Sequence, residues 1–439
     1  MQHRRMRPKL SQFKATGPGK ADSVAGMKRA LMDNWALFLG MLFLMVANGL
    51  LVTLLSIRGA GLGFTPLTIS LMQTCYPLGA LIGTMTVPHL ISRVGHIRVF
   101  SALASLVSTA AIIHLLTNDP WSWSAMRFLA GVCFPGLYVV TESWLNAKTE
   151  NRIRAQVLSV YFIIQTLGPA LGTALVGFPD PSGNLMFGIV SVLMSLAIVP
   201  LLLSDNRAPE FTVPERMTVR RLYKVSPMAV LGIVLMSVGV SAWFIALPLY
   251  ALRQGFSPAQ ASGALVVAMI AAGLVQYPVG WLSDNTDRRY VVIGMSVISA
   301  LVALWMAVDT SSSRTVIGFA IIAAATLPIY SILAAHANDH LQPGQVVPAS
   351  GTMAFLMQLG QVFGMLLGPN LIAVADDRGL QILLVVIGVG VAMIGVARRV
   401  RSQAPEDTGE VVATGILGMV QPGMLQAEVM AEDEAISGK

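Results

Sequence analysis

The stretch Trp35–Ile57 reads WALFLGMLFLMVANGLLVTLLSI and carries no charged residue. A helix needs about 20 mainly apolar residues to cross the hydrocarbon core of a bilayer. Because lipid offers the backbone no hydrogen-bond partners, such a stretch is expected to be helical. Eleven similar stretches follow, so the sequence predicts an all-α membrane protein of twelve transmembrane helices, at about 35–57, 66–91, 98–118, 122–146, 156–178, 184–204, 227–252, 258–283, 290–308, 314–337, 349–375 and 378–397.

The composition agrees with this prediction. Hydrophobic residues make up 55% of the chain, charged residues 12%, and the mean hydropathy is +0.69. A soluble domain carries about twice that share of charged residues. The longest hydrophilic linker divides the helices six and six, which gives a predicted order of cytoplasmic tail, six-helix bundle, central loop, second six-helix bundle and cytoplasmic tail at 1–34, 35–204, 205–226, 227–397 and 398–439.

The lysines and arginines indicate the orientation. With the N-terminus in the cytoplasm, 24 of the 29 lie on the cytoplasmic side, although the loop after helix 10 has none. Arg127 lies within the fourth span, and four lie outside: Arg58, Arg253, Arg314 and Arg378. The positive-inside rule therefore predicts a multi-pass protein of the bacterial inner membrane with both termini cytoplasmic. Since the distribution of the basic residues matches the two sides of the membrane, the net charge of +7 does not indicate binding to nucleic acid.

The two termini differ in character from the spans. Residues 1–26 are basic and lack apolar periodicity, so we expect them to be unstructured, with no cleaved signal peptide and Met27 as an alternative start. Residues 401–439 are acidic and contain Pro405 and Pro422. We expect this tail to be mostly disordered, with one short amphipathic helix near 423–431.

An internal repeat relates the two halves. The end of helix 2, PHLISRVGH at 88–96, aligns with the end of helix 8, GWLSDNTDRR at 280–289, with an offset of 192 residues. Pro135 in helix 4 aligns with Pro328 in helix 10 with an offset of 193. Two parallel six-helix repeats are typical of a secondary transporter whose halves rock about a site at the midplane.

The second of these loops resembles the loop signature of the major facilitator superfamily, Gly-x-Leu-x-Asp-x-x-Asp-Arg-Arg at 280–289. The loop after helix 2 keeps Arg93 and Gly95 of that signature, whereas Pro88 and Ser92 stand in place of its glycine and its acid. The resemblance covers about residues 31–400. It implies the twelve-helix, two-repeat fold and a transport function.

Further motifs agree with the resemblance. Arg127-Phe128-x-x-Gly131 resembles the helix-4 arginine motif of the superfamily, and Gly168-Pro169-x-x-Gly172 resembles its antiporter motif, without the leading glycine. The stretches TESWLN at 141–146 and AHANDH at 335–340 resemble the YcaD-type branch. Glycine and proline also pack and bend helices for structural reasons alone. A related pattern stands in helix 11: Gly360, Gly364, Gly368 and Pro369.

The main candidate for the substrate site is Arg127, because an arginine within a membrane must face protein or water and have a partner. Asn48, Gln73 and Gln165 lie at comparable depths on helices that the resemblance places around the central cavity. Together they would bind an anion or relay protons. Alternatively, Arg127 snorkels outward or caps carbonyls freed by the helix-5 proline. The C-terminal half offers Tyr330, Gln358, Gln361, Trp243 and Phe244, for which packing is the alternative role.

Glu142 lies about 22 Å beyond Arg127 along helix 4, so the two cannot pair. It is either one side of an ion pair at the cytoplasmic gate, with Arg93, Arg152 or Arg154, or a protonation site that couples transport to protons. The predicted gate comprises Ser92, Arg93, Glu142, Asp284 and Arg288.

In this gate a carboxylate stabilises the N-terminus of a neighbouring helix. We expect Asp284 to act on helix 5 near Arg154 in this way. Ser92 is uncharged and would offer the N-terminus of helix 11 only a neutral cap. The gate contacts of the two halves should therefore differ in strength.

Catalytic and metal-binding signatures are missing from the sequence. His336 and His340 are four residues apart but lack a third ligand, and Cys75 and Cys133 fall inside predicted helices. We therefore expect neither an enzyme nor a metal or cofactor site, and a proton gradient as the energy source. The expected protein is a monomer that contacts membrane lipids and a small-molecule substrate, and exports it by proton antiport. An uptake symporter, a lipid or lysolipid translocator and a non-transporting membrane sensor are the alternatives.

Overall fold

The computed structural model describes residues 28–149, 151–178, 184–204, 209, 213, 217–308, 312–342, 345–375 and 378–401. The predictions for residues 1–26, for a start at Met27, for most of 205–216 and for the tail beyond Arg401 lie outside these residues. Within the described part the chain is helical throughout and has no strand. Its helices are α2 (Trp35–Gly61), α3 (Pro66–Val94), α4 (His96–Leu116), α5 (Pro120–Lys148), α6 (Asn151–Leu175), α7 (Leu185–Leu196), α8 (Ile198–Leu203), α9 (Val219–Val225), α10 (Pro227–Arg253), α11 (Pro258–Asp284), α12 (Arg288–Val308), α13 (Ser312–Thr326), α14 (Ile329–Asn338), α15 (Val346–Val374) and α16 (Gly379–Arg401).

Each of the twelve predicted spans is found among these helices, whereas α9 lies within the predicted central loop and is not a span. Two spans are broken: the sixth at Ala197, between α7 and α8, and the tenth at Leu327–Pro328, between α13 and α14. Eleven spans in the described part are long and apolar enough to cross a membrane. The twelfth is α3, which has 29 residues and a more polar sequence with two internal prolines. The prediction of twelve helices in two repeats is confirmed.

The first turn of each half repeats in structure as well as in sequence. The turns Gly63–Pro66 and Gly255–Pro258 are 192 residues apart, and their glycines have φ values of 79° and 81°. Only glycine adopts this left-handed conformation without strain. The next helix in each case begins with proline at a first-turn position, and a Thr65 or Ser257 side chain accepts a backbone N–H as the N-cap. The same local interactions therefore end the first helix and begin the second helix in both halves.

The N-terminal end of α5 has its own cap. The Asp119 carboxylate accepts hydrogen bonds from the Ser122 backbone N–H at 2.7 Å and from the Ser122 hydroxyl at 2.8 Å. These hydrogen bonds stabilise the charged form and lower the pKa of Asp119. The cap therefore depends on an ionised carboxylate outside the membrane-spanning segment.

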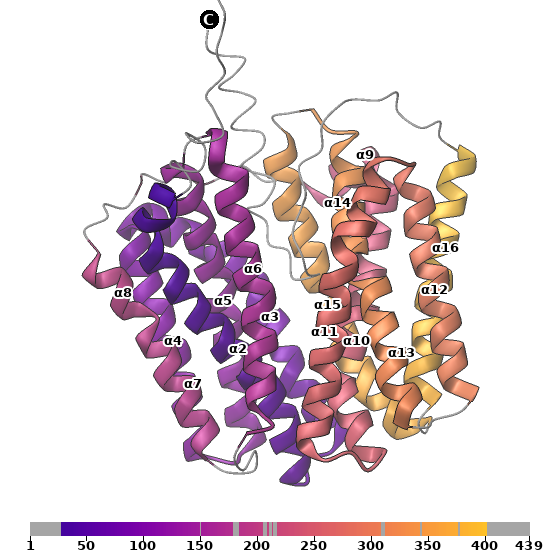
Figure 1. Cartoon of the computed structure of the whole chain (residues 1–439), viewed down its shortest axis with the longest axis horizontal. Coiled ribbons are helices and arrows are strands. Elements are labelled where there is room, and N and C mark those ends of the chain that lie inside the picture. The colour runs from indigo at the N-terminus through magenta and orange to yellow at the C-terminus, as the bar shows by residue number, and fades with distance from the viewer. Residues whose placement is uncertain are drawn as a thin grey trace, which may run out of the picture.

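The two halves form adjacent bundles with the same internal packing (Figure 1). In the first half α2 packs on α6, α3 on α5, and α4 on α7. In the second half the equivalent helices pack in the same way: α10 on α15, α11 on α13, and α12 on α16. The halves meet mainly where α3 packs on α15 and α6 on α11. Both interfaces contain one helix from each half, as a rocking mechanism requires.

Glycines explain the close approach within each bundle. A Cβ atom on Gly172 of α6 would overlap the carbonyl oxygen of Val46 in α2. In the second half, a Cβ on Gly364 of α15 would overlap the carbonyl oxygen of Val238 in α10. Small residues at such contacts let helix backbones approach closely in a membrane. The glycines of the antiporter-like motif therefore have a packing role.

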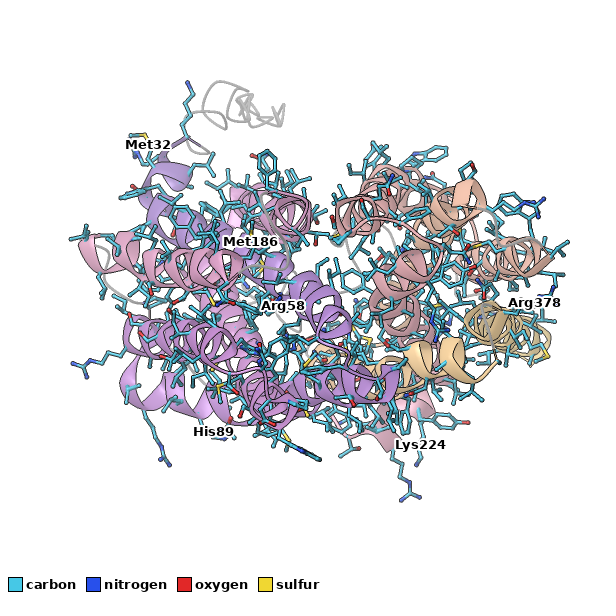
Figure 2. All side chains as sticks on the ribbon, turned by 90° about the horizontal axis from the view of Figure 1, so that it is seen from below. Met32, Arg58, His89, Met186, Lys224 and Arg378 are labelled. Carbon is cyan, nitrogen blue, oxygen red and sulfur yellow. The ribbon has the colours of Figure 1, made fainter. Side chains whose placement is uncertain are left out.

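The outer surface is apolar, as a lipid-facing surface requires. On α16 the exposed residues Ile382, Val386, Val389, Met393 and Val396 recur every three or four positions, so they form one stripe along the helix. Figure 2 looks along the bundles and shows Arg58 near the middle, with Arg378 and Lys224 at the edge. In the sequence of the helices, Arg58 lies near the end of α2 and Arg378 directly precedes α16, so both charges lie at helix ends.

Candidate functional site

A cavity lies between the two halves and contains about 900 Å³ of space, part of which is open solvent. Both halves contribute to its wall: α2, α3, α5 and α6 from the first, and α10, α11, α15 and the α13–α14 break from the second. Its lining comprises Asn48, Val52, Tyr76, Arg127, Tyr138, Gln165, Pro169, Val240, Ser241, Phe244, Ile245, Met269, Leu327, Met357, Gln358, Gln361 and Met365.

Several lining residues occupy equivalent positions in the two repeats. Gln165 and Gln358 are 193 residues apart, and both line the cavity. The same offset relates Asn48 to Ser241 and Tyr76 to Met269. The cavity is therefore built around the axis that relates the repeats. This is the position expected for the substrate site of such a transporter.

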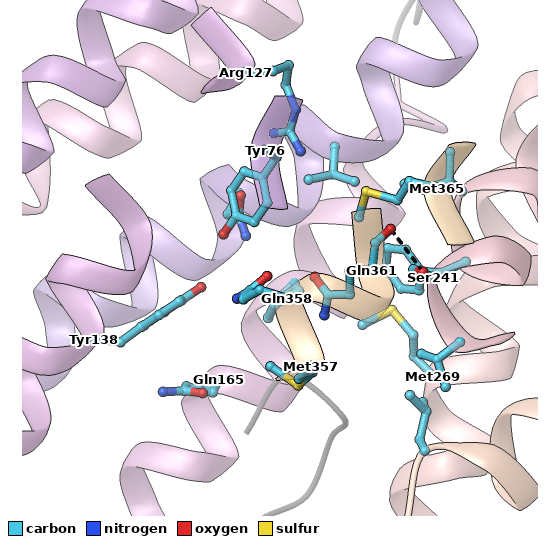
Figure 3. Close-up of a pocket in the computed structure, with 17 residues that line it drawn as sticks. Tyr76, Arg127, Tyr138, Gln165, Ser241, Met269, Met357, Gln358, Gln361 and Met365 are labelled. Atoms are coloured by element: carbon cyan, nitrogen blue, oxygen red, sulfur yellow. Dashed lines mark hydrogen bonds between the residues drawn. The ribbon is translucent and has the colours of Figure 1, made fainter. Parts of the chain in front are cut away.

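Arg127 is the most unusual residue of the cavity wall. It is only 1% exposed, and its Cζ lies 4.6 Å from the centre of the Tyr76 ring. This distance is suitable for a cation–π interaction. Its Nε and Nη1 atoms are buried without a hydrogen-bond partner among the described residues. The guanidinium is thus covered on one face while donors on its edges remain unused (Figure 3).

Amide groups surround the same cavity. Asn48 Oδ1, Gln165 Nε2 and Gln358 Oε1 are buried and have no hydrogen-bond partner in the described structure. Gln361 lines the cavity as well, and its backbone carbonyl accepts the Ser241 hydroxyl at 3.3 Å. Buried polar atoms are almost always hydrogen bonded. These unused atoms therefore indicate a place where water or a solute binds.

Three of the nine candidate cavity residues do not line the cavity. The Gln73 side chain donates to Ser56 Oγ at 3.0 Å and to the carbonyl of Val52 at 3.3 Å, so it joins α3 to α2. Tyr330 is 6% exposed and belongs to the hydrophobic core of α14. Neither side chain is among those that line the cavity. Trp243 is also fully buried, and its indole N–H donates to Thr326.

Glu142 lies outside the cavity, one helical turn beyond the lining residue Tyr138 on α5. It is 2% exposed, and Tyr161 donates its hydroxyl hydrogen to Oε1 at 3.2 Å. A buried carboxyl group that is hydrogen bonded to a tyrosine is a group whose protonation can change with its surroundings.

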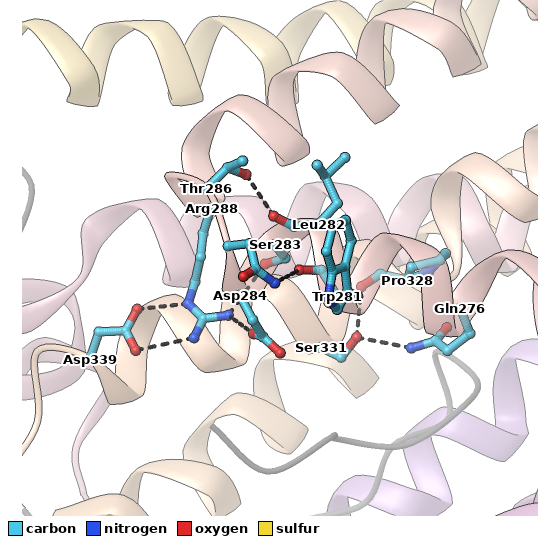
Figure 4. Close-up of polar contacts among 11 residues, drawn as sticks. Gln276, Trp281, Leu282, Ser283, Asp284, Thr286, Arg288, Pro328, Ser331 and Asp339 are labelled. Atoms are coloured by element: carbon cyan, nitrogen blue, oxygen red, sulfur yellow. Dashed lines mark hydrogen bonds and ion pairs between the residues drawn. The ribbon is translucent and has the colours of Figure 1, made fainter. Parts of the chain in front are cut away.

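The predicted gate residues of the second half, Asp284 and Arg288, belong to an ionic cluster at the C-terminal end of α11 (Figure 4). Arg288 donates to Asp284 at 2.8 Å, to Asp339 at 2.8 Å and to the Ser283 hydroxyl at 3.3 Å. This cluster, Asp284–Arg288–Asp339, joins the ends of α11 and α14 to the start of α12. The side chains near Arg154 are outside the described ones, so the contact of Asp284 with α6 stays a prediction.

The predicted gate residues of the first half are not joined in this way. Ser92 is exposed, and its hydroxyl donates to the carbonyl of His89 in its own helix at 2.9 Å, so the prediction that it caps helix 11 is wrong here. Arg93 is exposed whereas Glu142 is buried. At the position equivalent to Arg288, His96 instead contacts the Ser143 hydroxyl at 3.0 Å.

The remaining candidates are two histidines and two cysteines, and their contacts are typical of residues that stabilise the fold. The rings of His336 and His340 are 4.8 Å apart and packed edge to face, and His340 Nδ1 lies 2.8 Å from the carbonyl of His336. Cys75 and Cys133 are free thiols. The described residues contain no cluster of three His, Cys, Asp or Glu side chains that would hold a metal ion.

The sequence did not single out Tyr76, Tyr138 or the three methionines of the cavity. The repeat offset could have found two of them, since Met269 is the equivalent of Tyr76. Met357 directly precedes the predicted residue Gln358. Tyrosine and methionine in a membrane helix are otherwise indistinguishable from packing residues.

A membrane protein of two six-helix repeats around a shared central cavity is a transporter by class. The chain belongs to the Major Facilitator Superfamily, whose family model matches residues 37–365 and 254–418. The "Uncharacterized MFS-type transporter YcaD" of Escherichia fergusonii is 28% identical over 338 residues, which are 76% of this chain and 86% of the relative. The protein of the same name from Salmonella arizonae is 27% identical over 342 residues, 77% of this chain and 87% of the relative. The resemblance to the YcaD-like branch is confirmed.

Solved structures share the fold. The nucleoside transporter NupG has a TM-score of 0.70 at 13% identity, over 83% of this chain and 98% of NupG. A bacterial homologue of the human lysosomal transporter Spinster, solved in an inward-facing and unoccupied conformation, has a TM-score of 0.68 at 14% identity, over 87% of this chain and 96% of the homologue.

Proposed function

We propose that this transporter is a secondary active exporter of the bacterial inner membrane, which moves a small molecule outward in exchange for protons and works as a monomer with both termini in the cytoplasm. The observation that carries the proposal is Arg127: a buried charge with unused donors in a cavity lined by both halves. An intramembrane arginine is costly unless structure or function supports it.

Alternating access is supported by the way in which the halves meet. At the outer ends, a Cβ on Gly177 after α6 would lie 3.3 Å from the Cβ of Ala259 in α11, so these helices touch there. At the inner ends, Asp284 of α11 has a side chain that is 34% exposed. The α6–α11 pair is thus in contact at its outer end while the inner end of α11 faces solvent. Closure of the inner end would complete a rocking cycle.

Glu142 is our proposed coupling residue. It lies one turn from the cavity on the helix that carries Arg127, and Tyr161 hydrogen bonds to it. Protonation of a buried carboxyl removes its charge and therefore changes which partners it favours. Since the sequence has no phosphate-binding loop, a proton gradient is the simplest energy source.

The test uses inverted membrane vesicles that contain the full-length protein. Candidate substrates would come from a comparison of metabolite accumulation between a deletion strain and an overexpressing strain. In vesicles with an acidic interior, a true antiport substrate should release protons, which a pH-sensitive dye detects. The matched control is Arg314→Gln, which removes one arginine near the outer end of α13, where it lies over Trp305 and outside the cavity lining.

Three results would contradict the proposal. Proton uptake together with substrate in right-side-out vesicles would indicate a symporter. Lipid movement between leaflets without solute flux would indicate a lipid translocator. Absence of any flux, combined with a phenotype that disappears when residues 402–439 are deleted, would indicate a sensor.

A further inference from the structure

The charge of the cavity wall limits the solute that can occupy it. Among the 17 lining residues, all of which the structure describes, Arg127 is the one charged residue. The equivalent position in the second half, 193 residues later, is Ala320. The wall therefore carries a single positive charge, on one side. A cation entering this cavity would meet repulsion and would find no lining carboxylate.

The environment of Arg127 leaves room for one more partner. Tyr76 covers one face of the guanidinium, and Arg127 has no ion pair among the described residues. Nε lies on one edge of the planar group and Nη1 on the other, and both are unbonded. A buried charge is stable only when it is paired and hydrogen bonded. An incoming anion would satisfy both requirements.

The wall contributed by the second half is different. Met269, Met357 and Met365 line it together with Phe244 and Leu327 (Figure 3). Methionine side chains are flexible and polarisable, so they fit apolar groups of varied shape. Asn48 and Gln165 of the first half and Gln358 of the second half also line the cavity, and each has an unused polar atom.

From this arrangement, and resting on the proposed function, we infer that the cargo is a small amphipathic monoanion, a carboxylate on an apolar body. Its carboxylate pairs with Arg127 in the first half, and its apolar body lies against the methionines of the second half. A planar carboxylate matches the guanidinium in shape, and along either edge it can accept one hydrogen bond from Nε or Nη1 and a second from Nη2. One positive charge balances one negative charge, which favours a carboxylate over a doubly charged phosphate ester.

The inference is tested by binding, using purified full-length protein in detergent. The probes are benzoate and its matched analogues benzamide, benzylamine and phenyl phosphate, and the readout is the shift in Tm with its concentration dependence. Benzoate should bind at least about tenfold more tightly than benzamide, because hydrogen bonds to a charged partner exceed those to a neutral one by this amount. From butyrate to hexanoate to octanoate, affinity should rise by up to about fourfold for each methylene group.

Variants identify the residue responsible. Arg127→Gln should abolish the preference for benzoate over benzamide, and Arg127→Lys should retain only part of it. The control Arg314→Gln should keep the preference unchanged. If Arg127→Gln does not fold, the comparison of the four probes on the natural protein decides alone. Equal binding of benzoate and benzamide, tighter binding of benzylamine or phenyl phosphate, or no shift with any carboxylate overturns the inference.

These outcomes are separate from those of the flux test. Export of a neutral or cationic solute, with no response to any carboxylate, would refute the cargo class and leave the proposed exporter intact. Carboxylate binding that depends on Arg127, without flux under any gradient, would refute the exporter and leave the binding class intact.

Discussion

Replacing Gly172 by alanine should loosen the contact between α2 and α6. The new Cβ would overlap the carbonyl oxygen of Val46 and would lie 2.6 Å from the backbone nitrogen of Leu50. Real Cβ atoms essentially never approach another heavy atom closer than 3.0 Å. Because both obstacles are backbone atoms, no side-chain rotation relieves the overlap, and the two helices must move apart.

The size of the effect follows from two opposing terms. Overpacking a tight contact costs about 1–3 kcal/mol. Alanine is about 0.5–1 kcal/mol better than glycine inside a helix. Gly188→Ala in α7 provides the matched control, because a Cβ there meets no atom within 4 Å. It should be neutral or slightly stabilising, so the two variants should differ by about 1–3 kcal/mol in free energy of unfolding.

The assay is thermal unfolding of the detergent-solubilised protein, with the monodisperse fraction measured after heating. Gly172→Ala should have the lower Tm, and Gly364→Ala in α15, at the equivalent contact with Val238, should behave likewise. Equal Tm values for Gly172→Ala and Gly188→Ala would refute the packing role. If transport were lost at unchanged Tm, the antiporter-like motif would have a direct functional role instead.

Three further predictions concern carboxylates. Asp284→Ala leaves Arg288 paired with Asp339 and should lower the free energy of unfolding by less than about 1 kcal/mol, because the Asp284 side chain is 34% exposed. The same variant should raise the labelling of cavity cysteines from the cytoplasm. Unchanged labelling would count against a role of Asp284 in closing the gate. Glu142→Gln should abolish proton-driven transport but keep exchange of substrate for substrate in counterflow, and retention of proton-driven transport would exclude Glu142 as the coupling residue. Since the folded-state pKa of Asp119 is lowered, its cap stabilises the protein above the unfolded-state pKa, and this stabilisation is lost as pH falls through the folded-state pKa. Asp119→Ala should therefore lower Tm at neutral pH and have no effect on Tm in acid. An equal loss of Tm at both pH values would disprove a charged cap.

The fold was predictable because hydrophobic length and turn chemistry act locally. The seventh and eighth spans were predicted at 227–252 and 258–283, and the helices run over Pro227–Arg253 and Pro258–Asp284. The breaks in the sixth and tenth spans were not predicted. Pro135 and Pro328 are equivalent residues, yet α5 continues through Pro135 whereas the tenth span breaks at Pro328.

Surrounding contacts explain part of this difference. At the break, the Ser331 hydroxyl donates to the carbonyl of Pro328 at 2.8 Å, and the amide of Gln276 donates to Ser331 at 3.2 Å (Figure 4). The carbonyl of Pro328 also accepts the backbone N–H of Ile332 at 3.3 Å, so these side chains add hydrogen bonds at the point where the helix is interrupted. Proline alone therefore does not determine where a membrane helix breaks, because neighbouring helices decide whether a break can be stabilised.

The candidate site was predictable in depth along each helix but not in direction. Asn48, Arg127 and Gln165 line the cavity as expected, whereas Gln73 faces α2 and Tyr330 faces the core. A helix that is apolar all round has no polar face from which its orientation can be read. Similarly, the partner that a charged residue contacts depends on how the helices pack in three dimensions.

The two repeats share positions but divide the charges between them. At the cavity the first half has Arg127 where the second has Ala320, and at the inner end the second half has Arg288 where the first has His96. The charge that we propose to bind cargo and the charge cluster that joins helix ends thus belong to different halves. Cargo bound to one half can affect the cluster of the other half only through contacts between them. Glu142 lies in the first half, one helical turn beyond the cavity residue Tyr138 and on the helix that carries Arg127. For this reason we expect its protonation, more than cargo binding alone, to decide which side of the membrane the cavity faces.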